Sequence, residues 1–180
     1  LPILAAQILW LNLVTDGFLD VALAMEPKEK DLLKKTFEHP SKYLIDKLSV
    51  KRMVVMAIPM MIGTLYLFTQ TYQTDIVKAW TVSLTTLAVF QWLNAWNCKS
   101  EDRSIFKTNP FENKFLIAAT LMVVLLQLFA LYNPFMQKIL HTTPLSLADW
   151  VPIILISFSV ILVEEIRKFY SRRKLVSSLT

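Results

Sequence analysis

The chain has 180 residues, of which 54% are hydrophobic and 12% aromatic, and its formal net charge is +5. A soluble domain of this length is seldom so apolar, because it must also cover its surface with polar groups. The positive charge does not indicate nucleic-acid binding, since the basic residues stand beside apolar stretches, as they do in membrane proteins. The composition therefore excludes an ordinary soluble enzyme and favours a protein embedded in a lipid bilayer.

Apolar stretches of about 20 residues, long enough to cross a bilayer, recur along the chain. They cover approximately residues 3–25, 53–72, 79–97, 115–132 and 150–166. The predicted fold is therefore all-α, a bundle of five transmembrane helices in which residues 1–180 form one membrane domain. The charged loop from Glu26 to Arg52 is expected to be partly helical and cytoplasmic. It is either a solvated loop or a docking surface for a cytoplasmic domain.

The basic residues predict the orientation of the chain. All Lys and Arg residues except Lys78 and Lys138 fall in the segments that follow the first, third and fifth apolar stretches. Basic loops stay on the cytoplasmic side of a membrane. The N-terminus is thus expected to be external and the C-terminus cytoplasmic. Cys98 is the sole cysteine, and we expect a reduced thiol near the cytoplasmic face.

The first apolar stretch carries polar side chains in its middle. Asn12, Asp16 and Asp20 recur every fourth residue and share one face of a helix, and Thr15 borders that face. A carboxylate at membrane depth costs at least about 2.5–3.5 kcal/mol, so it needs a cavity, a partner or an ion. Carboxylate, amide and hydroxyl oxygens are ligands of hard cations, and Gly17 lowers the cost of a local break that frees backbone carbonyls. A cation or proton site is favoured over charge pairing, because no basic residue lies deep in any stretch.

Other polar residues in the apolar stretches are weaker signals. Gln91, Asn94 and Asn97 line one side of the third stretch, and such amides often only join neighbouring helices. Gln91 is therefore either an ion ligand or a contact between helices. Gln127 is expected to be structural, and Glu164, beside basic residues, is expected to form a surface ion pair. The sequence contains no glycine-rich phosphate loop and no nucleophile–base pair, so this chain alone is not expected to hydrolyse ATP.

Two motifs resemble a known family. The first motif, from Trp10 to Pro27, resembles the sixth transmembrane helix of P-type cation-transporting ATPases of the calcium-pump type; its sequence is WLNLVTDGFLDVALAMEP. The second motif, from Gln91 to Phe106, resembles their eighth helix and the loop after it; its sequence is QWLNAWNCKSEDRSIF. Their order and spacing match helices six to ten, so the resemblance covers the whole chain. Leu19 stands where many members have proline, which implies a helix that unwinds less.

The resemblance implies roles for the site residues. Asn12 and Asp16 match ion ligands of the sixth helix, and Thr15 matches a further contributor in pumps with two calcium sites. Asp20 replaces a small residue and could add a ligand or a proton acceptor. Gln91 stands where two-site pumps have glutamate, which favours a single site for calcium, with manganese, sodium or proton exchange as alternatives.

The resemblance also implies partners that this chain lacks. ATP and magnesium would bind to cytoplasmic domains in an N-terminal remainder of the same pump, which would also supply the other transmembrane helices. The leading hypothesis is thus the C-terminal membrane half of an ATP-driven cation pump. The alternative is a stand-alone regulatory or scaffold membrane protein with a vestigial ion site. An upstream reading frame continuous with Leu1 and encoding a phosphorylation motif would favour the pump.

Overall fold

A computed structural model describes residues 1–26, 47–99, 104–107 and 109–177, which contain helices and no strands. The elements are α1 (Ala5–Trp10), η1 (Leu11–Asp16), α2 (Gly17–Ala24), α3 (Lys47–Tyr72), α4 (Ile76–Cys98), η3 (Ile105–Lys107), η4 (Pro110–Glu112), α5 (Lys114–Tyr132), α6 (Pro134–Leu140), α7 (Leu147–Ser157) and α8 (Ser159–Ser177). The all-α prediction is confirmed. Most of the loop expected to be partly helical lies in residues 27–46, outside the described residues.

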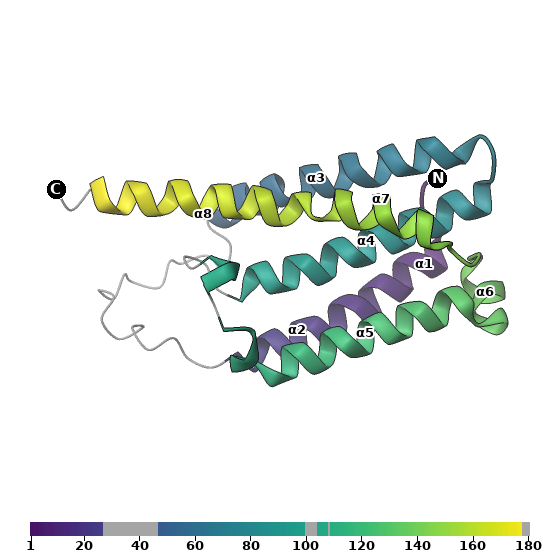
Figure 1. Cartoon of the computed structure of the whole chain (residues 1–180), viewed down its shortest axis with the longest axis horizontal. Helices are drawn as coiled ribbons and strands as arrows, with labels where there is room; N and C mark the ends of the chain where they lie inside the picture. The colour runs from purple at the N-terminus through teal and green to yellow at the C-terminus, as the bar shows by residue number, and fades with distance from the viewer. Residues whose placement is uncertain (27–46, 100–103, 108, 178–180) are drawn as a thin grey trace.

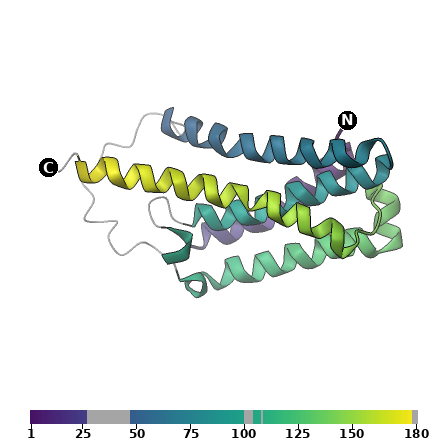
Figure 2. The ribbon, with the colours of Figure 1, turned by 45° about the horizontal axis from the view of Figure 1, so that its top comes forward.

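Five helical stretches of the described chain are long and apolar enough to cross a membrane. They are Ala5–Ala24, Ser49–Tyr72, Ile76–Cys98, Lys114–Tyr132 and Leu147–Tyr170. The first consists of α1, η1 and α2, and the last of α7 and α8. Figures 1 and 2 show these spans running lengthwise beside one another, with the two termini at opposite ends of the bundle. The chain is therefore a multi-pass membrane protein, as predicted.

Helix α4 forms the centre of the bundle. Over an apolar 18-residue stretch of α4, 61% is buried, against 28% in the corresponding stretch of each other span. Helix α4 packs against α2, α3, α5, α7 and α8. Ala79 and Ala88 are fully buried, and Ser83 and Thr86 donate their hydroxyls to carbonyls one turn earlier in the helix. Because lipid tails are as apolar as leucine, close packing of such small residues is what holds membrane helices together.

A buried glutamine connects three of the spans. Trp10 Nε1 in the first span donates a hydrogen bond to Gln127 Oε1 of α5 at 3.1 Å, and Gln127 Nε2 donates to Thr85 Oγ1 of α4 at 3.4 Å. The side chain of Gln127 is only 1% exposed. This is the structural role predicted for it.

The expected surface ion pair at Glu164 is buried instead, and that prediction is wrong. Glu164 is 0% exposed, and it lies 3.1 Å from Arg52 of α3, 2.8 Å from Arg167 and 4.0 Å from Lys168. Lys168 Nζ also donates to the backbone carbonyl of Asn97, near the end of α4, at 3.0 Å. Because α8 packs against both α3 and α4, these neighbours cover Glu164. We refer to Glu164, Arg52, Arg167 and Lys168 as the Glu164 cluster.

Candidate functional site

The middle of the first span is a π-helix. Over Leu11–Asp16 the backbone forms hydrogen bonds five residues back, and the N–H of Gly17 donates to the carbonyl of Asn12. Gly17 itself has ordinary helical angles, with φ −55° and ψ −47°. The break expected at Gly17 is therefore absent, and a widened turn takes its place. Short π-helical segments within α-helices are rare and often occur at functional sites.

The predicted polar face divides into a covered and an open part. Thr15 is 2% exposed and faces the interior of the bundle. Asp16 is partly buried, whereas Asn12 and Asp20 are exposed at the surface of the described helices. The structure thus brings Thr15 and Asp16 into contact with the neighbouring spans and leaves Asn12 and Asp20 outside.

Asp16 and Gln91 lie together between the first span and α4. Gln91 Nε2 donates a hydrogen bond to Asp16 Oδ2 at 3.1 Å. The other amide atom, Gln91 Oε1, is buried and has no hydrogen-bond partner among the described residues. A buried acceptor without a partner is uncommon in proteins and requires an explanation, such as an ion that binds there. The pair therefore offers a carboxylate and an unsatisfied carbonyl oxygen at membrane depth.

The described residues provide only part of a ligand set for a cation. Calcium takes six to eight oxygen ligands, and no three His, Cys, Asp or Glu side chains gather into a metal site within the described ranges. Asp16, Gln91 and the adjacent Thr15 supply one carboxylate together with neutral oxygens. Such a set suits a hard cation, but further oxygens must come from elsewhere.

Two buried polar residues that the sequence analysis did not single out fix the ends of the first span. Gln7 is 0% exposed, and its Nε2 donates to the carbonyl of Leu140 at 2.9 Å. Asn113 donates to the carbonyl of Ala22 at 3.0 Å and to the carboxylate of Glu26 at 2.6 Å. The only sequence signal was the position of Asn113 two residues before the start of the apolar run at Phe115, which is typical of a helix N-cap. These contacts hold the π-helical segment in position between its neighbours.

Comparison with known proteins identifies relatives that match most of the chain. The family described as "Cation transporting ATPase, C-terminus" matches residues 1–170. A calcium-transporting ATPase of Bacillus subtilis (strain 168) is 34% identical over 157 residues, which cover 86% of this chain and 18% of the relative. Calcium-transporting ATPase 1 of Saccharomyces cerevisiae is 32% identical over 96% of this chain and 18% of its own length. Calcium-transporting ATPase type 2C member 1 of Homo sapiens is 29% identical, over 96% and 19% respectively. The chain thus spans less than a fifth of the length of these relatives.

Proposed function

The chain belongs to the family of cation-transporting ATPases, whose C-terminal region it represents, and we propose that it is the C-terminal membrane half of an ATP-driven calcium pump. In this role the chain contributes part of an intramembrane ion site. The transported ion is the substrate, and it binds at Asp16 and its neighbours while it crosses the membrane.

The observation that carries this proposal is the contact between Asp16 and Gln91. A carboxylate in the middle of a membrane span is costly unless it serves an ion, a proton or a partner. Here its hydrogen-bond partner is a neutral amide, whose own oxygen has no hydrogen-bond partner among the described residues. A cation placed between the two side chains would receive a negative charge from Asp16 and a ligand from Gln91 Oε1.

We assign the other ligands by their position beside this pair. Thr15 contributes a hydroxyl or a backbone carbonyl from the π-helical segment. Asn12 and Asp20 lie on the exposed side, where helices of the N-terminal part of the pump would complete the site. An exposed carboxylate such as Asp20 in a membrane span also requires protein or water rather than lipid around it. This requirement supports a larger protein around the described bundle.

The chemistry of ATP belongs to the rest of the pump. ATP and magnesium would bind in cytoplasmic domains of the N-terminal part, and phosphorylation there would change the affinity of the ion site. The distribution of Lys and Arg along the chain supports an external N-terminus and a cytoplasmic C-terminus. The neutral side chain of Gln91 supports one ion site rather than two, and the oxygen ligands support calcium.

The substitution Asp16→Asn in the complete pump tests this proposal. It removes the charge but keeps the shape of the side chain, and we expect it to abolish calcium-dependent phosphorylation by ATP. Asp75→Asn is a matched control, because Asp75 is an exposed cap residue at the start of α4 and its replacement should leave phosphorylation unchanged. Normal phosphorylation and transport by the Asp16→Asn pump would refute the assignment.

A further inference from the structure

The π-helical turn that carries Asp16 is anchored at its start by Trp10. Trp10 directly precedes η1, and its Nε1 donates a hydrogen bond to Gln127 Oε1 of α5 at 3.1 Å. At the other end of the turn, Asp16 accepts a hydrogen bond from Gln91 Nε2 of α4, also at 3.1 Å. Because η1 packs against both α4 and α5, with the first span beside both helices (Figure 1), these two bonds hold the turn at its two ends.

The width of the turn determines the direction of Asp16 relative to Trp10. Backbone hydrogen bonds run four residues back in an α-helix and five in a π-helix, so each residue of the wider turn rotates less about the helix axis. If Leu11–Asp16 relaxed to an α-helix while Trp10 stayed bound to Gln127, Asp16 would rotate away from Gln91. The two hydrogen bonds together thus favour the widened turn over a regular one.

Gln127 is a firm anchor because its amide is buried. The residue is only 1% exposed, and the loss of a partner by a buried amide is costly. Its Nε2 donates to Thr85 Oγ1 of α4 at 3.4 Å. Thr85 is fully buried, and it precedes Gln91 by six residues on the same helix, which is about 9 Å along the helix axis. Gln127 therefore connects the start of the π-helical turn with the helix that carries Gln91.

We propose that Gln127 is a positioning residue for the transported ion: through its bonds to Trp10 and Thr85 it holds the π-helical turn in register with α4, so that Asp16 meets Gln91. This role rests on the proposed function, in which Asp16 binds the ion. Gln127 acts through Asp16 and is not itself a ligand. Loss of the anchor should weaken calcium binding and leave phosphorylation at saturating calcium intact, because all ligands remain present.

The calcium dependence of phosphorylation by ATP in the complete pump tests this role. Trp10→Phe removes the indole N–H and keeps an aromatic ring. It should raise the calcium concentration for half-maximal phosphorylation about fivefold and leave the maximal level unchanged. Trp96→Phe is the matched control, because Trp96 Nε1 also donates to a side chain of α5, Thr120 Oγ1, at 3.1 Å, but that bond involves no residue of the first span. Equal shifts in the two variants would overturn the proposal.

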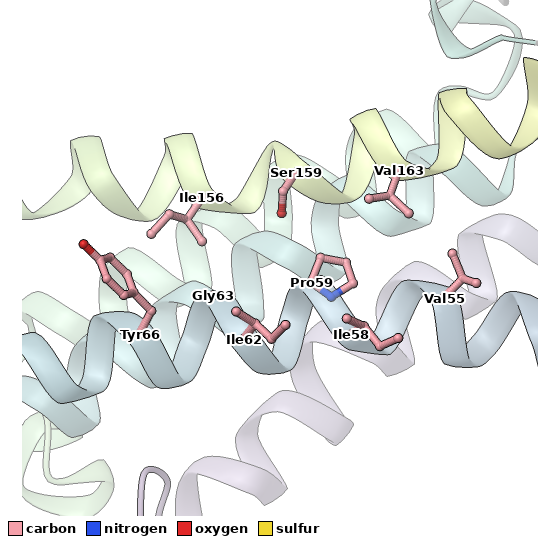
Figure 3. A pocket seen from close by; sticks show the side chains of 9 residues that line it. All are labelled: Val55, Ile58, Pro59, Ile62, Gly63, Tyr66, Ile156, Ser159 and Val163. Carbon is pink, nitrogen blue, oxygen red and sulfur yellow. The ribbon is translucent and has the colours of Figure 1, made fainter.

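A second matched pair tests the bond from Gln127 to α4. Thr85→Val removes the accepting hydroxyl and should shift the calcium response in the same direction as Trp10→Phe. The control is Ser159→Ala, which removes a hydroxyl from an apolar groove of about 630 Å³ between α3 and the α7–α8 pair (Figure 3). No residue of the first span or of α5 lines this groove, so the response should be unchanged. Equal responses of Thr85→Val and Ser159→Ala would contradict the proposal.

A double variant separates positioning from a purely structural role. In Trp10→Phe the buried oxygen of Gln127 loses its donor, which should lower the thermal unfolding temperature. Adding Gln127→Leu makes both partners apolar, which should restore much of that temperature. The calcium response should stay weakened, because the anchor is still absent. Recovery of the calcium response together with stability would show that Gln127 has no positioning role.

Asp16→Asn, measured alongside, distinguishes failure of this role from failure of the proposed function. A normal calcium response in Asp16→Asn would refute the ion site and the role of Gln127 with it. A lost response in Asp16→Asn, combined with an unshifted response in Trp10→Phe, would refute only the role of Gln127. The expected result is a lost response in the first variant and a shifted one in the second.

Discussion

Gln91 donates a hydrogen bond to the carboxylate of Asp16 from one end of its amide, while the other end, Oε1, is buried and has no partner within the described part of the chain. The two residues belong to different spans and are 75 positions apart in the sequence. Without an ion, the N–H of Gln91 offsets part of the cost of the carboxylate in the membrane. When an ion binds, we expect the amide of Gln91 to rotate and present Oε1 to it, so that the same side chain serves the ion-free and the ion-bound state.

This relationship predicts that two substitutions of Gln91 differ in their effect on calcium-dependent activity. Gln91→Leu removes the oxygen and should raise the calcium concentration for half-maximal phosphorylation at least about tenfold, a loss typical of groups that support a metal ligand. Gln91→Glu keeps an oxygen and should retain calcium-dependent activity. Gln70→Leu, at an exposed position of α3, is the control. Equal loss in both Gln91 variants would instead indicate a role restricted to helix contact.

Asp20 is expected to influence ion choice but not stability. It is exposed on the described helices, so Asp20→Ala should change the free energy of unfolding by less than about 0.5 kcal/mol. In the complete pump, the same substitution should change the ratio of calcium to manganese transport or the coupling to protons. The measurement compares transport of the two ions and thermal stability in one preparation. Unchanged ion preference would leave Asp20 without a part in the site.

The Glu164 cluster should be important for stability. Glu164→Gln leaves Arg52, Arg167 and Lys168 without their shared carboxylate, and breaking a buried charge pair costs about 3–5 kcal/mol. A clear fall in the thermal unfolding temperature of the pump is expected. Glu112→Gln is the control, because its side chain is 57% exposed and exposed pairs contribute at most about 1 kcal/mol. Equal unfolding temperatures for the two variants would contradict the structural role of Glu164.

The two glycines of the chain should respond differently to substitution by alanine. At Gly63 a Cβ would approach Ile156 Cγ2 to 2.5 Å and the Phe90 ring to 3.1 Å, whereas at Gly17 the nearest atom is 3.7 Å away. Gly63→Ala should therefore destabilise the bundle by about 1–3 kcal/mol, and adding Ile156→Ala should relieve part of that strain. Gly17→Ala should preserve stability. Thermal unfolding of the three variants tests this, and a stable Gly63→Ala protein would show that α3 and α7 are less closely packed.

Hydrophobic length was sufficient to predict the five spans, because crossing a bilayer requires a minimum apolar run that few other structures need. The cost of carboxylates in lipid likewise singled out Asp16 and Asp20. What sequence could not provide was the contact between separate spans. The hydrogen bond from Gln91 to Asp16 and the burial of Glu164 depend on how α4 and α8 pack. The π-helical turn was missed because Gly17 suggested a break, while the backbone continued as a widened helix.

Equilibrium binding of radioactive calcium to the complete pump in the absence of ATP shows whether Asp16 and Gln91 hold the transported ion. We predict one bound ion per pump, loss of that ion in Asp16→Asn, at least about tenfold weaker binding in Gln91→Leu, and unchanged binding in the Asp75→Asn control. Calcium binding by the Asp16→Asn pump with unaltered affinity and stoichiometry would contradict the claim that the pair of Asp16 and Gln91 holds the transported ion.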